Sequence, residues 1–202
     1  MSLTVNTHRI AKIQKIIEKG SIKTMLKIPV LNEMVRKRIR TELVTAFGNN
    51  FVEVIMGGAA FNKDIEKFFW DIDFPYTVGY GMTECSPIIT YAHFNKKKLY
   101  SCGQAAYNMQ IRIDSEDPER IEGEIQAFGP NIPLGYYKNE EATKDLFTED
   151  GWMKTGDMGI IDKDGYLFIR GRSKCMILGP NGQNIYPEEL ESVINAVGYV
   201  VD

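Results

Sequence analysis

The sequence has little cysteine and little histidine. Among 202 residues there are only three cysteines and two histidines. Cys85, Cys102 and Cys175 are scattered, and their spacing matches neither a metal site nor a disulfide pattern. His8 and His93 lie far apart in the sequence, so we expect neither to be catalytic. These scarcities argue against a disulfide-stapled or zinc-bound fold and favour a reducing, cytoplasmic environment.

The sequence also lacks long hydrophobic runs. No apolar stretch reaches the ~20 residues that a membrane-spanning helix needs, and no charged-then-apolar signal peptide is expected at the N-terminus. Repeats and low-complexity segments are absent from the sequence as well. With 44% apolar and 25% charged residues, the chain has the composition of one large or two small globular domains with a sizeable core.

The net charge of −3 hides an uneven distribution. Residues 1–50 hold ten Lys and Arg against three Asp and Glu, whereas the remainder holds 14 basic and 24 acidic residues. A basic helical arm of this kind is typical either of a solvated outer helix face or of peripheral contact with an anionic membrane. We favour the solvated face, and we expect no nucleic-acid partner.

Helical periodicity dominates the first fifty residues. Isoleucines and lysines occupy opposite sides of a helical pattern in residues 8–27, which is interrupted near Gly20. A second helix is expected over Leu31–Phe47, where apolar residues recur at helical spacing until Gly48 ends it. The apolar stripe of this arm is most simply explained as core packing.

The next fifty residues predict a parallel α/β unit. A strand is expected at residues 52–56, then a short helix that begins at the N-cap Asn62 and runs through Trp70, then a strand at residues 75–78. Strand–helix–strand order is typical of parallel sheets.

After Tyr91 the pattern changes to short β-like runs between turns rich in Gly, Pro, Asp and Asn. These runs are Gln110–Ile113, Glu124–Phe128, Met158–Ile161 and Tyr166–Ile169. They predict a small antiparallel, barrel-like region or a meander, with Asp162–Gly165 as the turn of a hairpin. From Ser173, a short strand, a tight turn at Gly179–Gly182 and a helix from Pro187 predict the start of an α+β unit.

The segment Gly79–Glu84 carries the most functional information. Glycine lets a backbone approach a ligand closely, and Tyr80 offers a flat face for a purine. Thr83 can donate to a phosphate oxygen, and Glu84 can hold Mg²⁺ while phosphates complete its shell. Since the segment follows an expected strand, it would lie where α/β sheets bind ligands. A Gly-rich turn without function is the alternative.

Four other segments accompany it in a fixed order, namely Gly57–Ala60, Gly151–Asp157, Gly171–Lys174 and Asn184–Glu191. In this order and at these separations, the five segments resemble the adenylate-forming, AMP-binding superfamily. That superfamily includes acyl-CoA synthetases, luciferases and peptide-synthetase adenylation domains. The resemblance runs from about Val52 to Glu191. Residues 123–131 and 135–139 are most similar to the long-chain fatty acid CoA ligase branch.

The resemblance assigns roles to individual residues. Asp157 would accept hydrogen bonds from a ribose diol, although an aspartate that caps a turn is the alternative. Arg172 would meet ribose or phosphate oxygens, although a plain surface arginine is the alternative. Thr83 and Glu84 would be catalytic, with Glu84 as the Mg²⁺ residue, and Lys174 would be a hinge between domains. The implied nucleotide-binding residues are Gly57, Gly58, Ala59, Gly79, Tyr80, Gly81, Met82, Asp157 and Arg172.

The resemblance also predicts how the chain is organised. Residues 1–97 would be the end of a large α/β domain with a basic helical arm, 98–172 a small β-rich subdomain, and 173–202 the start of a mobile C-terminal domain. The Ser/Thr/Gly-rich phosphate loop and the late catalytic lysine of the superfamily have no match in this sequence. We therefore expect a fragment that needs the remaining parts of its parent chain and is inactive when isolated.

The implied parent reaction has two steps. A fatty acid and ATP would form acyl-AMP, and coenzyme A as co-substrate would then displace AMP to give acyl-CoA. Mg²⁺ would assist the first step. Two alternatives stay open, namely adenylation of an amino or aryl acid, and a non-catalytic fragment that binds nucleotide or associates with a membrane.

Overall fold

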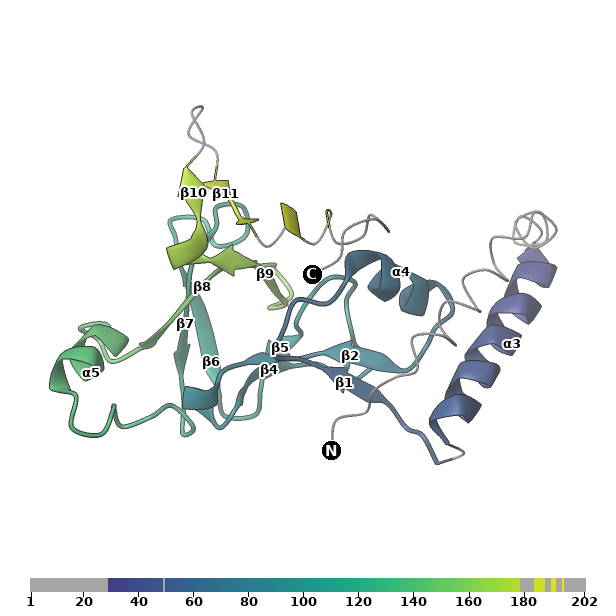
Figure 1. Ribbon diagram of the computed structural model, residues 1–202, viewed down its shortest axis with the longest axis horizontal. Helices are drawn as coiled ribbons and strands as arrows, with labels where there is room; N and C mark the ends of the chain where they lie inside the picture. Colours follow the sequence, from purple (N-terminus) through teal and green to yellow (C-terminus); the bar gives the residue numbers. More distant parts are fainter. Residues whose placement is uncertain (1–28, 49, 179–183, 188–189, 192–193, 195–202) are drawn as a thin grey trace. The chain divides into compact units, whose positions relative to one another are not determined.

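The computed structural model describes residues 29–48, 50–178, 184–187, 190–191 and 194 (Figure 1). The chain divides into two units: the first comprises Met1–Val52 and Lys67–Pro75, and the second comprises Glu53–Glu66 and Tyr76–Asp202. The helix expected over residues 8–27 and the turn expected at Gly179–Gly182 lie outside the described residues. The proposed domain boundaries after residues 97 and 172 stay predictions.

The first unit contains the helix α3 (Pro29–Phe47), which confirms the second expected helix. Its apolar stripe turns inward, since Leu43 is buried and Val35 and Ile39 are half-buried. Gly48 ends the helix with φ of +106°, a conformation that favours glycine. Among the described residues, no helix combines the length and the apolar character that crossing a membrane requires. Nothing in α3 supports the membrane contact that its basic residues suggested.

Aromatic rings hold the first unit together. The ring of Phe74 is fully buried and lies 5.8 Å from the ring of Phe47, 5.5 Å from that of Phe51 and 4.6 Å from that of Phe69. Such tilted and offset pairs suit the charge distribution of aromatic rings. The second expected helix is thus explained by core packing.

The second unit begins with the expected parallel pair. The strands β1 (Val54–Met56) and β2 (Tyr76–Val78) pair in parallel, and the helix α4 (Lys63–Asp71) lies between them in the chain. Asn62 caps this helix, because its side-chain oxygen accepts the backbone N–H groups of Asp64 at 3.0 Å and Ile65 at 3.1 Å. The predicted strand–helix–strand order is confirmed.

Antiparallel strands make up the rest of the second unit (Figure 1). One sheet holds β3 (Tyr80–Gly81), β4 (Ile88–Tyr91) and β5 (Gln104–Ala105). A larger sheet holds β6 (Gln110–Asp114), β7 (Gly123–Phe128), β8 (Met153–Ile161) and β9 (Leu167–Arg172) in sequential order. The helix α5 (Glu140–Leu146) connects β7 to β8. The 3-10 helices are η1 (Thr83–Cys85) and η2 (Ser173–Cys175), and a short hairpin comprises β10 (Ile177–Leu178) and β11 (Asn184–Ile185).

The larger sheet is a meander and not a barrel. Within the described residues, β6 and β9 are edge strands and do not pair with one another. The outer edge of β9 is instead bonded to the chain that leads into β5: Cys102 N–H donates to the Leu167 carbonyl at 2.8 Å, and Leu167 N–H donates to the Gly103 carbonyl at 2.9 Å. Because this edge is already occupied, the sheet stays open.

The hairpin expected at Asp162–Gly165 joins β8 to β9. One carboxylate oxygen of Asp162 accepts the backbone N–H groups of Asp164 and Tyr166, both at 3.0 Å, and Gly165 has φ of +81°. The expected helix from Pro187 is also consistent with the structure, since the described residues after Tyr186 are helical, namely Pro187, Leu190, Glu191 and Ile194.

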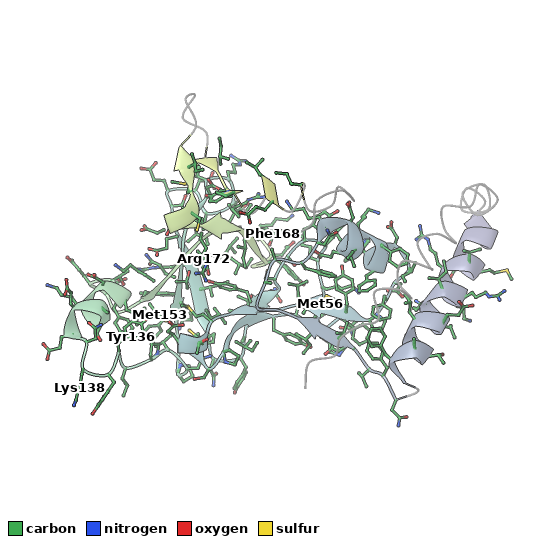
Figure 2. All side chains as sticks on the ribbon, in the orientation of Figure 1. Met56, Tyr136, Lys138, Met153, Phe168 and Arg172 are labelled. Carbon is green, nitrogen blue, oxygen red and sulfur yellow. The ribbon has the colours of Figure 1, made fainter. Side chains whose placement is uncertain are left out.

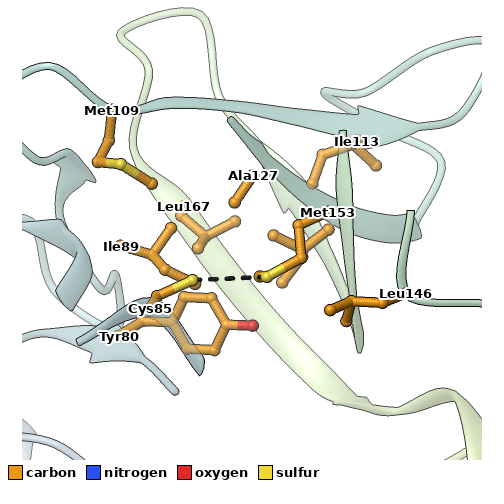
Figure 3. Close-up of a cluster of buried hydrophobic side chains, with 10 residues drawn as sticks. Tyr80, Cys85, Ile89, Met109, Ile113, Ala127, Leu146, Met153 and Leu167 are labelled. Carbon is orange, nitrogen blue, oxygen red and sulfur yellow. Dashed lines mark hydrogen bonds between the residues drawn. The ribbon is translucent and has the colours of Figure 1, made fainter. Parts of the chain in front are cut away.

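A hydrophobic core joins the two antiparallel sheets (Figure 3). Cys85 is fully buried in it, and its thiol contacts the sulfur of Met153 at 3.6 Å. Burial raises the pKa of the Cys85 thiol to about 11, so it stays protonated at neutral pH. Cys85 is therefore a packing residue of this core. The same core contains Tyr80, whose ring thereby gains a fixed orientation.

Candidate functional site

A cavity of about 720 Å³ opens at the carboxyl ends of β1 and β2 in the second unit. Seven of the residues singled out in the sequence line it, namely Gly58, Ala59, Gly79, Tyr80, Gly81, Asp157 and Arg172. A parallel sheet exposes the ends of its strands in this way, and ligands of α/β proteins bind there. The expected position of the site is therefore consistent with the structure.

The glycines permit a close approach between the two strand ends. Gly79 N–H donates to the carbonyl of Met56 at 2.8 Å, which brings the chain after β2 against the chain after β1. A side chain at Gly57 would place its Cβ 3.1 Å from the carbonyl oxygen of Gly79, and Gly58 has φ of +84°. Gly57 therefore supports the wall that Gly58 forms, without lining the cavity itself.

Tyr80, Asp157 and Arg172 meet at one side of the cavity. The Tyr80 hydroxyl donates to one carboxylate oxygen of Asp157 at 2.7 Å, and the Arg172 guanidinium lies 3.3 Å from the other. Arg172 extends from the end of β9, and its side chain is 70% exposed (Figure 2). The three residues are far apart in sequence, and their contact joins the β3 strand to the β8–β9 hairpin.

Asp157 lies within a strand and not at a turn. It sits in β8 directly opposite Arg172, and it shares the buried face of that strand with Met153 and Thr155. The alternative of a turn-capping aspartate is therefore wrong. Because side chains alternate along a strand, the same pattern that buries Met153 also directs Asp157 inward.

The Tyr80 hydroxyl stays protonated beside Asp157. Burial, followed by the adjacent Asp157 charge, raises the pKa of the Tyr80 phenol well above its usual range. The phenol therefore remains protonated and donates to Asp157. A carboxylate has about four lone-pair positions, so Asp157 can accept further hydrogen bonds while it keeps Tyr80.

Met82, Thr83 and Glu84 do not line the cavity. They lead into and form η1, after which the chain turns back into β4. Glu84 accepts a hydrogen bond from the hydroxyl of Tyr136 at 3.0 Å. The sequence predicts that Tyr80 and Glu84 belong to one ligand-binding segment, whereas the structure places their side chains in different surroundings.

Glu84 is a plausible metal ligand only in company with a substrate. Within the described part of the chain, no cluster of three or more His, Cys, Asp or Glu side chains could hold a metal. Mg²⁺ commonly binds one or two carboxylates and takes its other ligands from phosphates and water. A single half-buried carboxylate such as Glu84 fits that donor set.

Several residues of the cavity wall carried no signal in the sequence. Tyr100, Ser101 and Cys102 line it from the loop that precedes β5. The buried carboxylate of Glu66 fixes this loop by accepting Tyr100 N–H at 2.7 Å. Burial raises the pKa of the Cys102 thiol to about 12, so this thiol is not an activated nucleophile. A loop without periodicity gives no sequence pattern by which these residues could have been found.

The expected hinge residue Lys174 is part of η2, immediately after β9. Ser173 anchors the start of this turn, since its hydroxyl donates to the carbonyl of Gly156 at 3.0 Å. The position therefore lies at the border between the large sheet and the β10–β11 hairpin. Its hinge role stays a prediction.

Comparisons with known proteins agree on one family. Residues 3–137 match the model of a family described as AMP-binding enzyme. The chain is 35% identical to the 2-succinylbenzoate–CoA ligase of Listeria innocua, over 92% of this chain and 38% of that protein. It is 30% identical to the long-chain-fatty-acid–CoA ligase ACSBG2 of Rattus norvegicus, over 83% of this chain and 25% of that protein. The chain thus spans well under half the length of these relatives.

A solved structure shows the same relationship. The fold is similar to the O-succinylbenzoate coenzyme A synthetase MenE from Bacillus subtilis in complex with ATP and magnesium ion, with a TM-score of 0.66 and 28% sequence identity. The match covers 80% of this chain and 36% of the Bacillus protein.

Proposed function

Because the chain belongs to the AMP-binding enzyme family, we propose that the protein containing it is an ATP-dependent acid–thiol ligase. That protein would join a carboxylic acid to ATP as an acyl adenylate, release pyrophosphate, and then pass the acyl group to coenzyme A. The single observation that carries the proposal is the Tyr80–Asp157–Arg172 cluster at the cavity. An aromatic ring, a carboxylate and a cation are the groups that a purine, a ribose diol and a phosphate require.

Each member of the cluster has a separate task in this proposal. Tyr80 presents part of its ring to the adenine and also holds Asp157 by its hydroxyl. Asp157 accepts the ribose hydroxyls, and the exposed Arg172 reaches ribose or phosphate oxygens. Gly58 and Ala59 form the adjoining wall, where the lack of large side chains admits a flat base.

The chemistry at phosphate is assigned to the segment after β3. Thr83 is exposed and can donate to a phosphate oxygen, and Glu84 can hold Mg²⁺ by its carboxylate. When bound, Mg²⁺ neutralises charge on the phosphates and orients them. The similarity to a synthetase solved with ATP and magnesium ion supports this assignment.

Two classes of acid are candidates. The resemblance of residues 123–131 and 135–139 to fatty acid ligases favours a long-chain fatty acid, and the relative from Rattus norvegicus supports it. The relative from Listeria innocua, which matches more of the chain at higher identity, favours an aryl acid such as 2-succinylbenzoate. We place the fatty acid first and the aryl acid second.

ATP–pyrophosphate exchange by the protein that contains this chain tests the adenylation step, and formation of acyl-CoA after addition of coenzyme A tests the second step. Exchange that depends on palmitate would support the fatty acid, and exchange that depends on 2-succinylbenzoate would support the aryl acid. Nucleotide binding without exchange for any carboxylic acid would favour the non-catalytic alternative. The scarcity of cysteine is our basis for also proposing a cytoplasmic location, which cell fractionation would test.

A further inference from the structure

We propose that Tyr136 is a positioning residue that orients the Glu84 carboxylate toward the metal–nucleotide complex. The inference rests on the function proposed above and adds a residue to it. Tyr136 lies on the loop between β7 and α5, more than fifty residues from Glu84 in the sequence (Figure 2). It belongs neither to the cavity lining nor to the hydrophobic core.

The hydrogen bond from Tyr136 holds one oxygen of the Glu84 carboxylate and leaves the other oxygen available to a metal ion. The Tyr136 hydroxyl donates to Oε1 of Glu84 at 3.0 Å. A long acidic side chain on a surface turn would otherwise sample several rotamers, and ordering it costs free energy when a ligand binds. A donor that holds Oε1 removes part of that cost in advance, while Oε2 remains available to a cation.

The loop holds Tyr136 in place through its neighbours. The backbone N–H of Tyr136 donates to the hydroxyl of Thr143 at 2.9 Å, and that hydroxyl donates to the carbonyl of Asn139 at 2.7 Å. Asn139 in turn caps α5, because its side chain accepts the N–H of Ala142 at 3.0 Å. Tyr136 is therefore tied to the first turn of a helix and does not depend on a mobile loop for its position.

Gly135 permits this arrangement. Its φ of +140° is a conformation that side chains rarely adopt, and a Cβ at this position would come too close to the side chain of Thr143. Only glycine lets the chain approach Thr143 closely and then turn Tyr136 toward Glu84. Gly135 thus allows the backbone conformation that directs the Tyr136 side chain toward Glu84.

The same loop also fixes the backbone beneath Glu84. The side-chain amide of Asn131 donates to the carbonyl of Cys85 at 2.7 Å and to that of Ile88 at 2.8 Å. These two carbonyls flank the turn that follows Glu84. The loop therefore holds the backbone by Asn131 and the carboxylate by Tyr136, which is more than a single surface hydrogen bond would achieve.

The neighbouring tyrosine supplies a matched control. Tyr137 is 89% exposed and Tyr136 is 41% exposed, so loss of either hydroxyl leaves the core intact. We propose to measure, by calorimetry, the binding of the non-hydrolysable α,β-methylene analogue of ATP with Mg²⁺ to the protein that contains this chain. Binding of AMP without Mg²⁺ serves as the measure of an intact nucleotide site.

We expect Tyr136→Phe to weaken metal-dependent binding of the ATP analogue by about tenfold, the lower end of the range for partners that orient metal ligands. AMP affinity and the melting temperature should stay at wild-type levels, and Tyr137→Phe should change nothing. In the background of Glu84→Gln, Tyr136→Phe should have no additional effect, because it acts through the carboxylate.

The outcomes separate this inference from the function it rests on. If Glu84→Gln leaves metal-dependent binding unchanged, the proposed metal role of Glu84 is wrong. If Glu84→Gln weakens that binding while Tyr136→Phe does not, the positioning role of Tyr136 is overturned. An equal loss of AMP and analogue binding in Tyr136→Phe would also overturn it, since the residue would then be merely structural.

Discussion

Asp157 shows how one carboxylate can join two structural elements and still face a cavity. It is 8% exposed in the strand β8, yet it faces the cavity and accepts the Tyr80 hydroxyl. A buried carboxylate without donors would be costly. Tyr80 and Arg172 lie beside the Asp157 carboxylate, so these contacts hold this side of the cavity in place without a nucleotide.

We predict that Asp157→Ala, in the protein that contains this chain, weakens AMP binding strongly. Each lost hydrogen bond to a charged acceptor costs roughly 1.5–3 kcal/mol, which is about ten- to a hundredfold in affinity. Calorimetry with AMP measures this change. Asp145→Ala is the matched control, because Asp145 is an exposed carboxylate on α5. Unchanged AMP affinity in Asp157→Ala would refute the ribose assignment.

A second residue-scale prediction concerns Glu66. Burial raises the pKa of its carboxyl above the ordinary value of 4.5, so the fold favours the protonated form. The stabilising contribution is present below pH 4.5 and is lost as the pH rises through the raised pKa. Glu66→Gln keeps an acceptor for Tyr100 N–H and removes the buried charge. We therefore expect its melting temperature to exceed that of the wild type at pH 7.

The difference between Glu66→Gln and the wild type should shrink as the pH falls below the raised pKa, because the wild-type carboxyl then becomes neutral. Thermal melts at a series of pH values measure this change. A variant less stable than the wild type at pH 7 would mean that the ionised Glu66 gains more from its hydrogen bonds than burial costs.

The sequence indicates which residue types suit a nucleotide, but it does not indicate which side chains contact one another in the fold. The sequence predicts that Tyr80, Asp157 and Arg172 each contact a nucleotide, and the structure brings all three together. Glu84 was also selected, but its contact with Tyr136 could not be foreseen. The reason is that side-chain chemistry is a local property, whereas this contact depends on how a distant loop returns to the segment after β3.

At the scale of elements, the sequence predicts several longer segments well but misses the two-residue strands. The helix α3 and the strands β6 and β7 lie within a residue or two of their expected positions. The strands β3 and β5 have only two residues each, too few for an alternating pattern to show. The pairing at the outer edge of β9 could not be foreseen either, because its hydrogen bonds to Cys102 and Gly103 join segments that are far apart in the sequence.

The turn η2 carries the prediction that belongs to this scale. If the region after β9 rotates between the two half-reactions, a few residues there must absorb large changes in φ and ψ. Lys174→Pro would fix φ near −65° and restrict Ser173 before it. We expect acyl-CoA formation to fall roughly tenfold or more, about 1.4 kcal/mol in the barrier, while ATP–pyrophosphate exchange is largely retained.

Rates of the two half-reactions, measured separately, decide the role of Lys174. Lys174→Ala is the control, because it removes the side chain and leaves φ free. Equal loss of both steps in Lys174→Pro would indicate misfolding. No loss in either step would mean that Lys174 is an ordinary surface lysine, and the hinge role would then be abandoned.

At the scale of the whole molecule, charge limits what this chain can do alone. Three basic and three acidic residues line the cavity, namely Lys63, Arg170 and Arg172, and Asp64, Glu66 and Asp157. Their formal charges cancel, so the cavity walls supply no net positive charge to offset the negative charge of a triphosphate. In the proposed adenylation, stabilising the charge that develops would therefore depend on Mg²⁺ and on cations other than these cavity residues.

We predict that the isolated 202-residue chain binds AMP and ATP with similar affinity when Mg²⁺ is absent, and that it does not adenylate acids. The adenosine and ribose contacts lie within its own cavity, so AMP should bind. The additional phosphates of ATP meet walls without net positive charge, so they should add little. Calorimetry with both nucleotides, and ATP–pyrophosphate exchange with palmitate and with 2-succinylbenzoate, measure the two parts of this prediction. Acid-dependent exchange by the isolated chain would contradict it, because the described cavity would then supply the missing charge stabilisation by itself.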